Sequence, residues 1–241
     1  MKTRKQLPLI AKLNHIKIDV EAVLEHCREN NLLDTRLYTD IKYSAHSKHQ
    51  DFLVSNEFCK TNFFVEPGAP LLEGEKYRQL YLTDFDSSKA SGKVKLGQTN
   101  IFSRTRRLNP HSSTYLPEAD ELNYGVRNNL VSGPFETILD SFKSKITRVR
   151  LACLVAHYSI KPHVDYDPSY ITRYHIPLIT NQAALAKFEK NNEIYQYHLP
   201  ADGSVYFFNS GIKHWVENGG EHDRIHLIID THGQLDLKDY T

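Results

Sequence analysis

The chain has 241 residues, and its 30 basic and 29 acidic side chains leave a formal net charge of +1. This balance argues against a protein that binds nucleic acid through bulk positive charge. With 40% hydrophobic and 24% charged residues, the composition is that of a folded chain and not of a disordered one.

No segment has the pattern of a membrane helix or a secretory signal. The longest apolar run, Leu151 to Ala156, is far shorter than the roughly 20 residues that a membrane helix needs. Near the start, the apolar stretch from Leu7 to Ala11 is ended by a lysine, which makes it too short for a signal peptide. The three cysteines are too few and too widely spaced for a disulfide framework. We therefore expect a cytoplasmic protein with no membrane association.

Two helices are expected in the first part of the chain. Residues 19–33 have apolar side chains at helical spacing, and Asp19 can cap the start. Pro134 suits the first turn of a second helix, which continues with a helical stripe from Phe135 to Phe142. Residues 36–133, between the two helices, are expected to form irregular strands and loops.

From residue 146 onward the pattern changes to short strands separated by turn residues. A series of short strands of similar length is typical of a β-sandwich or barrel. We expect one domain over 1–241, with a helical and loop support region (1–145) and a β core (146–232). The expected strands are 149–157, 173–180, 193–199, 204–209 and 224–230.

Three residues in this half have the chemistry of a metal site. His163 and Asp165 are two positions apart, so on a strand both side chains would point to the same face. His214 follows 51 residues later, directly before a further expected strand. Two imidazoles and one carboxylate on one face of an ion form the facial triad of non-haem Fe(II) oxygenases.

Two alternatives remain open for this motif. Asp165 also fits a turn, because Asp165 to Pro168 is good turn chemistry. Asp167 is a rival ligand, although its spacing of four from His163 suits a helix better than a strand. The other histidines have no consistent set of partners and are expected to be structural; they include His157, His198, His222 and His226.

Arg224 strengthens the metal interpretation. It lies ten residues after His214 on the last expected strand, from which its side chain can reach the same pocket. A guanidinium binds a carboxylate through two parallel hydrogen bonds, which lysine cannot imitate. An iron triad with a buried arginine suits 2-oxoglutarate, whose keto-acid end chelates the metal while its far carboxylate pairs with the arginine.

The order of the motifs from Arg148 to Asp230 resembles that of a known family. The stretch contains Lys161-Pro162-His163-Val164-Asp165, then Arg173-Tyr174-His175, then a strand led by Gly203, and finally His214 and Arg224 at the spacing given above. This sequence is similar to the aspartyl/asparaginyl β-hydroxylase-like domain, a family that includes bacterial free-proline cis-hydroxylases.

The resemblance implies a mainly β fold, a double-stranded β-helix (jelly roll, cupin-like) with N-terminal supporting helices. It implies a hydroxylase that depends on Fe(II), the cosubstrate 2-oxoglutarate and O2. By this resemblance, His163, Asp165 and His214 bind the iron, and Arg224 binds the distal carboxylate of 2-oxoglutarate. Arg173 and His175 match positions that contact the cosubstrate.

We expect the substrate to be a free amino acid or an amino-acid-like small molecule. The family's animal peptidyl hydroxylases lack the carboxylate ligand, whereas this chain has Asp165. Arg104, Arg106 and Arg107 are candidates for holding the substrate carboxylate, and no nucleic acid partner is expected from them. The alternatives are a peptidyl aspartyl/asparaginyl hydroxylase and, in another class, a zinc-loaded or non-catalytic cupin-type binding protein.

Overall fold

Strands dominate the described part of the chain. The structure is a computed structural model that describes residues 1–35, 39–40, 77–84, 86, 88, 121–238 and 240. The helices and strands among these residues are β1 (Ile10–Lys17), α1 (Val20–Glu29), β2 (Thr39–Asp40), β3 (Tyr77–Tyr81), β4 (Thr83–Asp84), β5 (Val126–Arg127), α5 (Pro134–Asp140), β6 (Lys145–Leu154), β7 (Tyr158–Ser159), β8 (Thr172–Ile179), β9 (Ala184–Lys190), β10 (Glu193–His198), β11 (Ser204–Phe208), β12 (Lys213–Asn218) and β13 (Arg224–His232).

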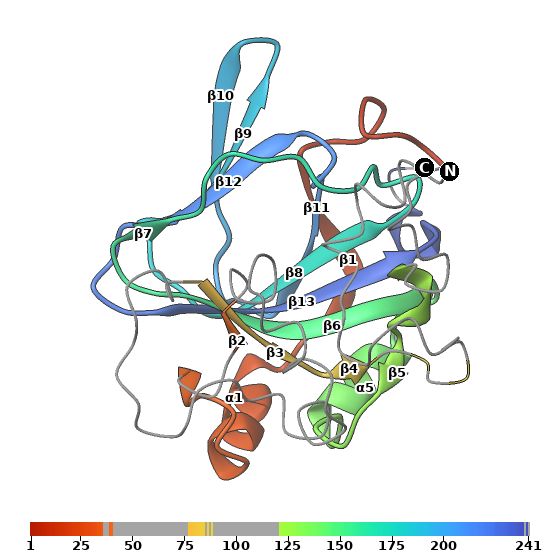
Figure 1. The fold of residues 1–241 in the computed structure, drawn as a ribbon, viewed down its shortest axis with the longest axis vertical. Helices are drawn as coiled ribbons and strands as arrows, with labels where there is room; N and C mark the ends of the chain where they lie inside the picture. The colour runs from red at the N-terminus through yellow and green to blue at the C-terminus, as the bar shows by residue number, and fades with distance from the viewer. Residues whose placement is uncertain are drawn as a thin grey trace, which may run out of the picture.

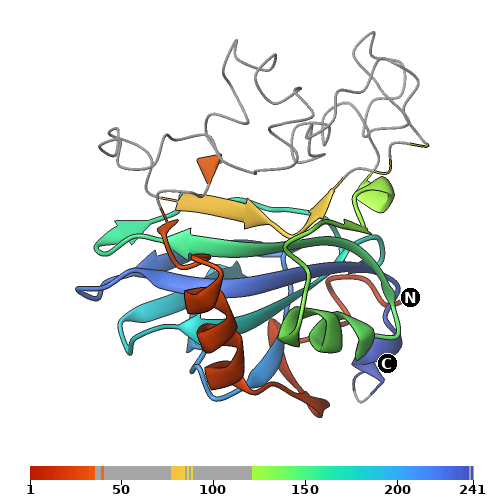
Figure 2. The same ribbon diagram turned by 90° about the horizontal axis from the view of Figure 1, so that it is seen from below.

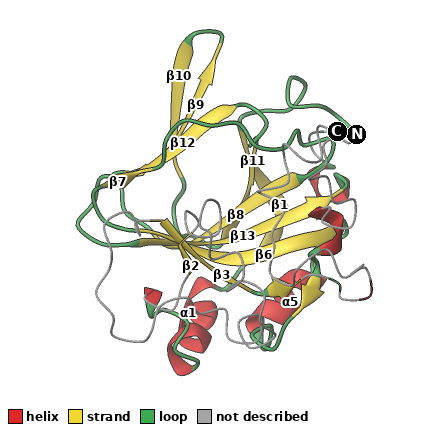
Figure 3. Ribbon diagram, in the orientation of Figure 1, coloured by secondary structure: helices red, strands yellow, loops and turns green. Residues whose placement is uncertain are grey.

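Most of the described strands form two facing antiparallel sheets, and β4 pairs with β5 in a separate two-stranded ladder (Figures 1 and 3). Among the described residues, the large sheet has the order β1-β11-β8-β13-β6-β3-β2 and the small sheet has the order β10-β9-β12-β7. From β6 to β13 the chain passes back and forth between the two sheets. This winding is the jelly-roll architecture. The prediction of a mainly β jelly roll with few helices is confirmed.

Most of the expected strands are found, with their ends shifted by a few residues. The sequence analysis did not predict β9 or β1, and β1 pairs with β11 at one edge of the large sheet. The first part of the chain therefore contributes strands as well as helices. Most of 36–133 lies outside the described residues, including Arg104, Arg106 and Arg107.

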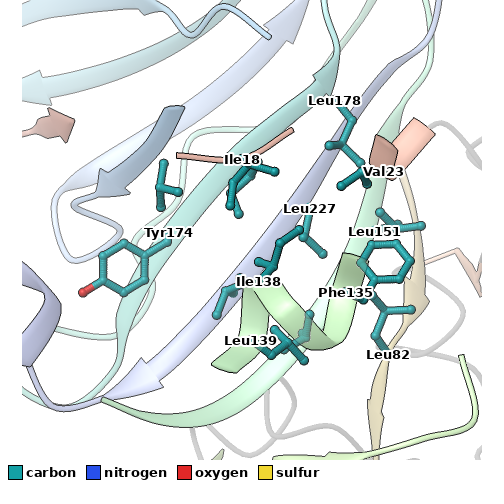
Figure 4. Close-up of a cluster of buried hydrophobic side chains, with 14 of the residues drawn as sticks. Ile18, Val23, Leu82, Phe135, Ile138, Leu139, Leu151, Tyr174, Leu178 and Leu227 are labelled. Carbon is teal, nitrogen blue, oxygen red and sulfur yellow. The ribbon is translucent and has the colours of Figure 1, made fainter. Parts of the chain in front are cut away.

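The two predicted helices cover the outer face of the large sheet (Figure 2). Asp19 caps α1 by accepting a hydrogen bond from the backbone N–H of Ala22 at 3.1 Å, and α5 begins with Pro134 as expected. Apolar side chains from both helices and from alternate strand positions form one buried core there (Figure 4). Neither helix is long and apolar enough to cross a bilayer, and the same holds throughout the described ranges.

Candidate active site

The backbone places His163 and His214 directly opposite each other. The N–H of His163 donates to the carbonyl of His214 at 2.9 Å, and the N–H of His214 donates back at 2.8 Å. His214 lies within β12, so the prediction that it precedes a strand is wrong by one or two residues. Cross-strand partners project to the same side of a sheet. This isolated bridge therefore brings together two imidazoles that are 51 residues apart in the sequence.

Asp165 reaches the same place from an extended segment and not from a regular strand. Its N–H donates to the carbonyl of Ser210 at 2.9 Å, and no named strand covers 160–171. The expectation of a strand at His163 and Asp165 is therefore wrong in detail. Pro162 has no N–H, so it interrupts a regular ladder at this point. The side chains of His163 and Asp165 nevertheless lie on the same side, as they would on a strand.

The three side chains converge as a metal site would require. Asp165 Oδ2 lies 3.9 Å from His163 Nε2 and 4.0 Å from His214 Nε2. One ligand atom from each residue lies within 4.8 Å of the other two. The rival ligand Asp167 instead accepts hydrogen bonds from the backbone N–H groups of Arg4 and Ser169. Asp167 is therefore the turn residue, and Asp165 is the carboxylate that lies with the two histidines.

The hydrogen bonds of both histidines leave the nitrogen that faces the site without a proton. His163 Nδ1 lies 2.8 Å from the carbonyl of Lys161, and His214 Nδ1 lies 2.9 Å from the carbonyl of Ile212. A carbonyl only accepts, so each Nδ1 carries the hydrogen and each Nε2 keeps its lone pair. Burial lowers the pKa of His214 to about 4, which keeps its ring neutral. Neutral imidazoles oriented by a carbonyl are typical metal ligands, so these residues fit a divalent metal.

Arg173 links the site to a buried ion-pair network. Its guanidinium pairs with Asp165 and, at 2.7 Å, with the fully buried Asp230, which also pairs with Arg150 at 2.8 Å. Burial alone would raise the pKa of Asp165, but Arg173 and then the two histidines hold it well below its usual range. Arg173 therefore fixes the ionised Asp165 beside His163 and His214.

A cavity of about 300 Å³ opens beside the three candidate ligands. Its walls come from both sheets, and they include Arg173 and His175 among the predicted cosubstrate contacts. Arg224 is not one of the lining residues. It is buried, and its Nη2 lies 2.9 Å from Nδ1 of His226, which in turn lies 3.3 Å from Nδ1 of His175. His175 on the cavity wall and His226 behind it thus form a row of contacts that ends at Arg224.

Asp230 and Arg150 were not predicted from the sequence. Asp230 pairs with Arg173, which contacts Asp165, and Arg150 pairs with Asp230. One signal could have found Asp230. Strand β13 is mainly apolar, but it contains the polar residues Arg224, His226 and Asp230, which are separated by two and by four positions. Side chains with this spacing share one face of a strand, so they predict a polar interior behind the cavity.

Comparisons with known proteins agree with the motif order. The family model of aspartyl/asparaginyl beta-hydroxylase matches residues 128–233. No curated protein sequence matches the chain.

Two solved structures are similar to this chain at low sequence identity. An oxidoreductase of the 2OG-Fe(II) oxygenase family from Burkholderia pseudomallei is 13% identical over 69% of this chain and 74% of that chain, with a TM-score of 0.38. A cupin domain from Bordetella pertussis is 15% identical over 39% of this chain and 88% of its own, with a TM-score of 0.29. The predicted resemblance to this family of hydroxylases is confirmed, because the aspartyl/asparaginyl beta-hydroxylase model matches residues 128–233 of this chain.

Proposed function

We propose that the protein is an Fe(II)- and 2-oxoglutarate-dependent dioxygenase that hydroxylates an unactivated C–H bond of a free amino acid or an amino-acid-like small molecule. The observation that carries the proposal is the convergence of His163 Nε2, His214 Nε2 and an Asp165 oxygen beside one cavity. When bound, iron with 2-oxoglutarate and O2 supplies the oxidising chemistry, and 2-oxoglutarate leaves as succinate and CO2. The protein positions the reactants and excludes water.

The charge balance between the sheets favours a dianionic ligand. Four buried arginines and three carboxylates that are buried or partly buried lie on this side of the large sheet; they are Arg148, Arg150, Arg173, Arg224, Glu121, Asp165 and Asp230. A divalent metal would raise the positive excess of this interior further. An unbalanced buried charge is costly. A dicarboxylate such as 2-oxoglutarate offsets that excess.

Arg224 is the arginine best suited to the distal carboxylate. Its hydrogen-bond partner among the described side chains is a neutral imidazole and not a carboxylate. Burial lowers the pKa of Arg224 to about 10, which reflects the cost of keeping this guanidinium away from water. A carboxylate that pairs with it through two hydrogen bonds would remove that cost. Arg173 and His175 line the cavity, and we assign them further contacts with the cosubstrate.

The substrate class is inferred from the cavity and the ligand set. The cavity of about 300 Å³ lies at the small end of ligand sites, which favours a small molecule. Lys161 lines it, is exposed, and lies two residues before His163. We assign it a contact with a substrate carboxylate. The arginines at 104, 106 and 107 remain further candidates for that role.

A peptidyl substrate is the second candidate, because the matching family model describes an aspartyl/asparaginyl hydroxylase. A third candidate is a zinc-loaded protein without 2-oxoglutarate, since zinc also accepts two histidines and a carboxylate. Metal analysis together with succinate formation separates the third candidate from the other two.

The test is a screen of substrates with the iron-loaded protein. Free L-amino acids and short peptides containing Asp or Asn are each incubated with 2-oxoglutarate and O2, and succinate and oxygen insertion into the substrate are measured. We expect coupled turnover with at least one free amino acid. Coupled turnover with a peptide and with none of the free amino acids would promote the peptidyl candidate.

A further inference from the structure

Three buried polar side chains form a line that leads from the cavity to Arg224. His175 lines the cavity and stacks on Phe208, with ring centroids 4.6 Å apart. Behind it lie His226, which is 1% exposed, and Arg224, which is 4% exposed. His226 Nδ1 is 3.3 Å from His175 Nδ1 and 2.9 Å from Arg224 Nη2. His226 is therefore the contact between the guanidinium and the cavity wall.

The chemistry of these contacts fixes the protonation of His226. A guanidinium has donors and no acceptor, so His226 Nδ1 must accept and its proton must be on Nε2. Burial first, and then the positive charge of Arg224, hold the pKa of His226 well below its usual range, so the ring stays neutral. Its Nε2 has no hydrogen-bond partner among the described residues.

An unpartnered buried N–H costs stability, and an apolar side chain of similar size would avoid that cost. Filling space in the core therefore does not account for a histidine at this position. What the imidazole provides is an acceptor at Nδ1. That acceptor meets a guanidinium that pairs with no carboxylate in the described part of the protein.

We propose that His226 is a positioning residue, whose Nδ1 lone pair orients the Arg224 guanidinium for the distal carboxylate of the cosubstrate. This inference rests on the proposed function. A flexible arginine side chain loses rotamer freedom when it binds a ligand. His226 restricts that freedom in advance, because Nη2 of Arg224 is already held at 2.9 Å from His226 Nδ1 while the other guanidinium nitrogens keep their donors for a carboxylate. Pre-orientation of this kind improves affinity without adding a contact to the ligand.

The test measures ligand binding rather than turnover. The protein is loaded with Mn(II) in place of iron, and the Kd of 2-oxoglutarate and of oxalate is measured by titration calorimetry. Oxalate chelates a metal but has no distal carboxylate. His226→Phe and His226→Leu remove the acceptor, whereas in His226→Asn the amide oxygen stands close to the position of Nδ1. Thermal unfolding identifies any variant that is not folded, and the second apolar variant covers the case in which phenylalanine does not fit.

We expect the apolar variants to weaken 2-oxoglutarate by about tenfold or more, as loss of a hydrogen bond to a charged group predicts. His226→Asn should stay within about threefold of the wild type, and the Kd of oxalate should be unchanged in all variants. Equal 2-oxoglutarate affinity in the wild type and in a folded apolar variant would overturn the proposal. An equal loss for oxalate and 2-oxoglutarate would also overturn it, because the effect would then be a general disturbance of the site. Wild-type protein that binds Mn(II) but no 2-oxoglutarate would contradict the proposed function itself.

Discussion

The two faces of the large sheet are built from the same strands but from opposite kinds of residue. On β13, Ile225, Leu227 and Ile229 belong to the apolar core together with residues of α1 and α5. Figure 4 shows Leu227 within this core. The alternating positions Arg224 and Asp230 lie on the opposite face, where Asp230 pairs with Arg150 and Arg173, and Arg224 contacts the neutral ring of His226. The alternation of a strand thus separates a stabilising face from a chemical face at every second residue.

This difference shows where stability and function are placed. The apolar face gains stability by removing hydrocarbon from water. The charged face gains little net stability, because removing charges from water offsets most of their attraction. Its residues are explained by what they hold: a carboxylate beside two imidazoles, and an arginine beyond the cavity.

The largest effect is expected from removing a metal ligand. His214→Ala should reduce metal binding to background, because a carboxylate and one imidazole leave the site incomplete. His163→Ala and Asp165→Ala should behave in the same way. Metal stoichiometry after dialysis measures this, with thermal unfolding to verify folding. The matched control is His157→Ala, because His157 is exposed and its side chain pairs with Glu221 at 3.1 Å, away from the triad. A loss of metal in that variant would show that the effect is not specific to the triad.

Asp230→Asn should cause the largest loss of stability. It leaves Arg150 and Arg173 without their shared carboxylate, and breaking a buried pair costs about 3–5 kcal/mol. Burial alone would raise the pKa of Asp230, but Arg150 and Arg173 hold it well below its usual range. A depressed folded-state pKa adds stability above the unfolded-state value of about 3.9, and that stability is lost as the pH falls below it.

The difference in the free energy of unfolding between the wild type and Asp230→Asn should therefore be largest near neutral pH and should become smaller below about pH 4. Urea denaturation at several pH values checks this. A difference that is constant with pH would show that the carboxylate charge is not what stabilises this face.

Arg224→Lys should weaken 2-oxoglutarate with a smaller effect on the metal. Lysine keeps the charge but cannot form two parallel hydrogen bonds to a carboxylate. We expect a loss of roughly 2–5 kcal/mol in binding for Arg224→Ala, and a smaller loss for lysine. Titration with 2-oxoglutarate measures both. Unchanged affinity in Arg224→Ala would remove this arginine from the site.

Ile229→Val should have the smallest effect, although Ile229 is the chain neighbour of Asp230. It deletes one methylene group from the apolar face, which typically costs about 0.5–1.5 kcal/mol of unfolding free energy. Binding of metal and of 2-oxoglutarate should be unchanged. If this variant altered ligand binding as strongly as Asp230→Asn, the two faces would not be independent.

The sequence predicted much of the site because its residues form motifs in register. His163, Asp165 and His214 were found from spacing and residue type, and the jelly roll was inferred from resemblance. β1 was missed because its partner β11 lies far away along the chain and leaves no local signal. β9 was missed because most of its residues are Ala, Lys and Glu, which are uncommon in strands. Asp230 and Arg150 were missed because their role depends on cross-strand neighbours, which only the folded sheet brings together.

The most direct test of the central claim is the conversion of 2-oxoglutarate to succinate by iron-loaded wild-type protein, measured beside Asp165→Ala and His157→Ala under the same conditions. The account predicts iron-dependent succinate from the wild type and from His157→Ala, and only background succinate from folded Asp165→Ala. Wild-type turnover in Asp165→Ala would contradict the assignment of the carboxylate ligand, and no succinate from iron-loaded wild-type protein with any substrate tested would contradict the proposed activity.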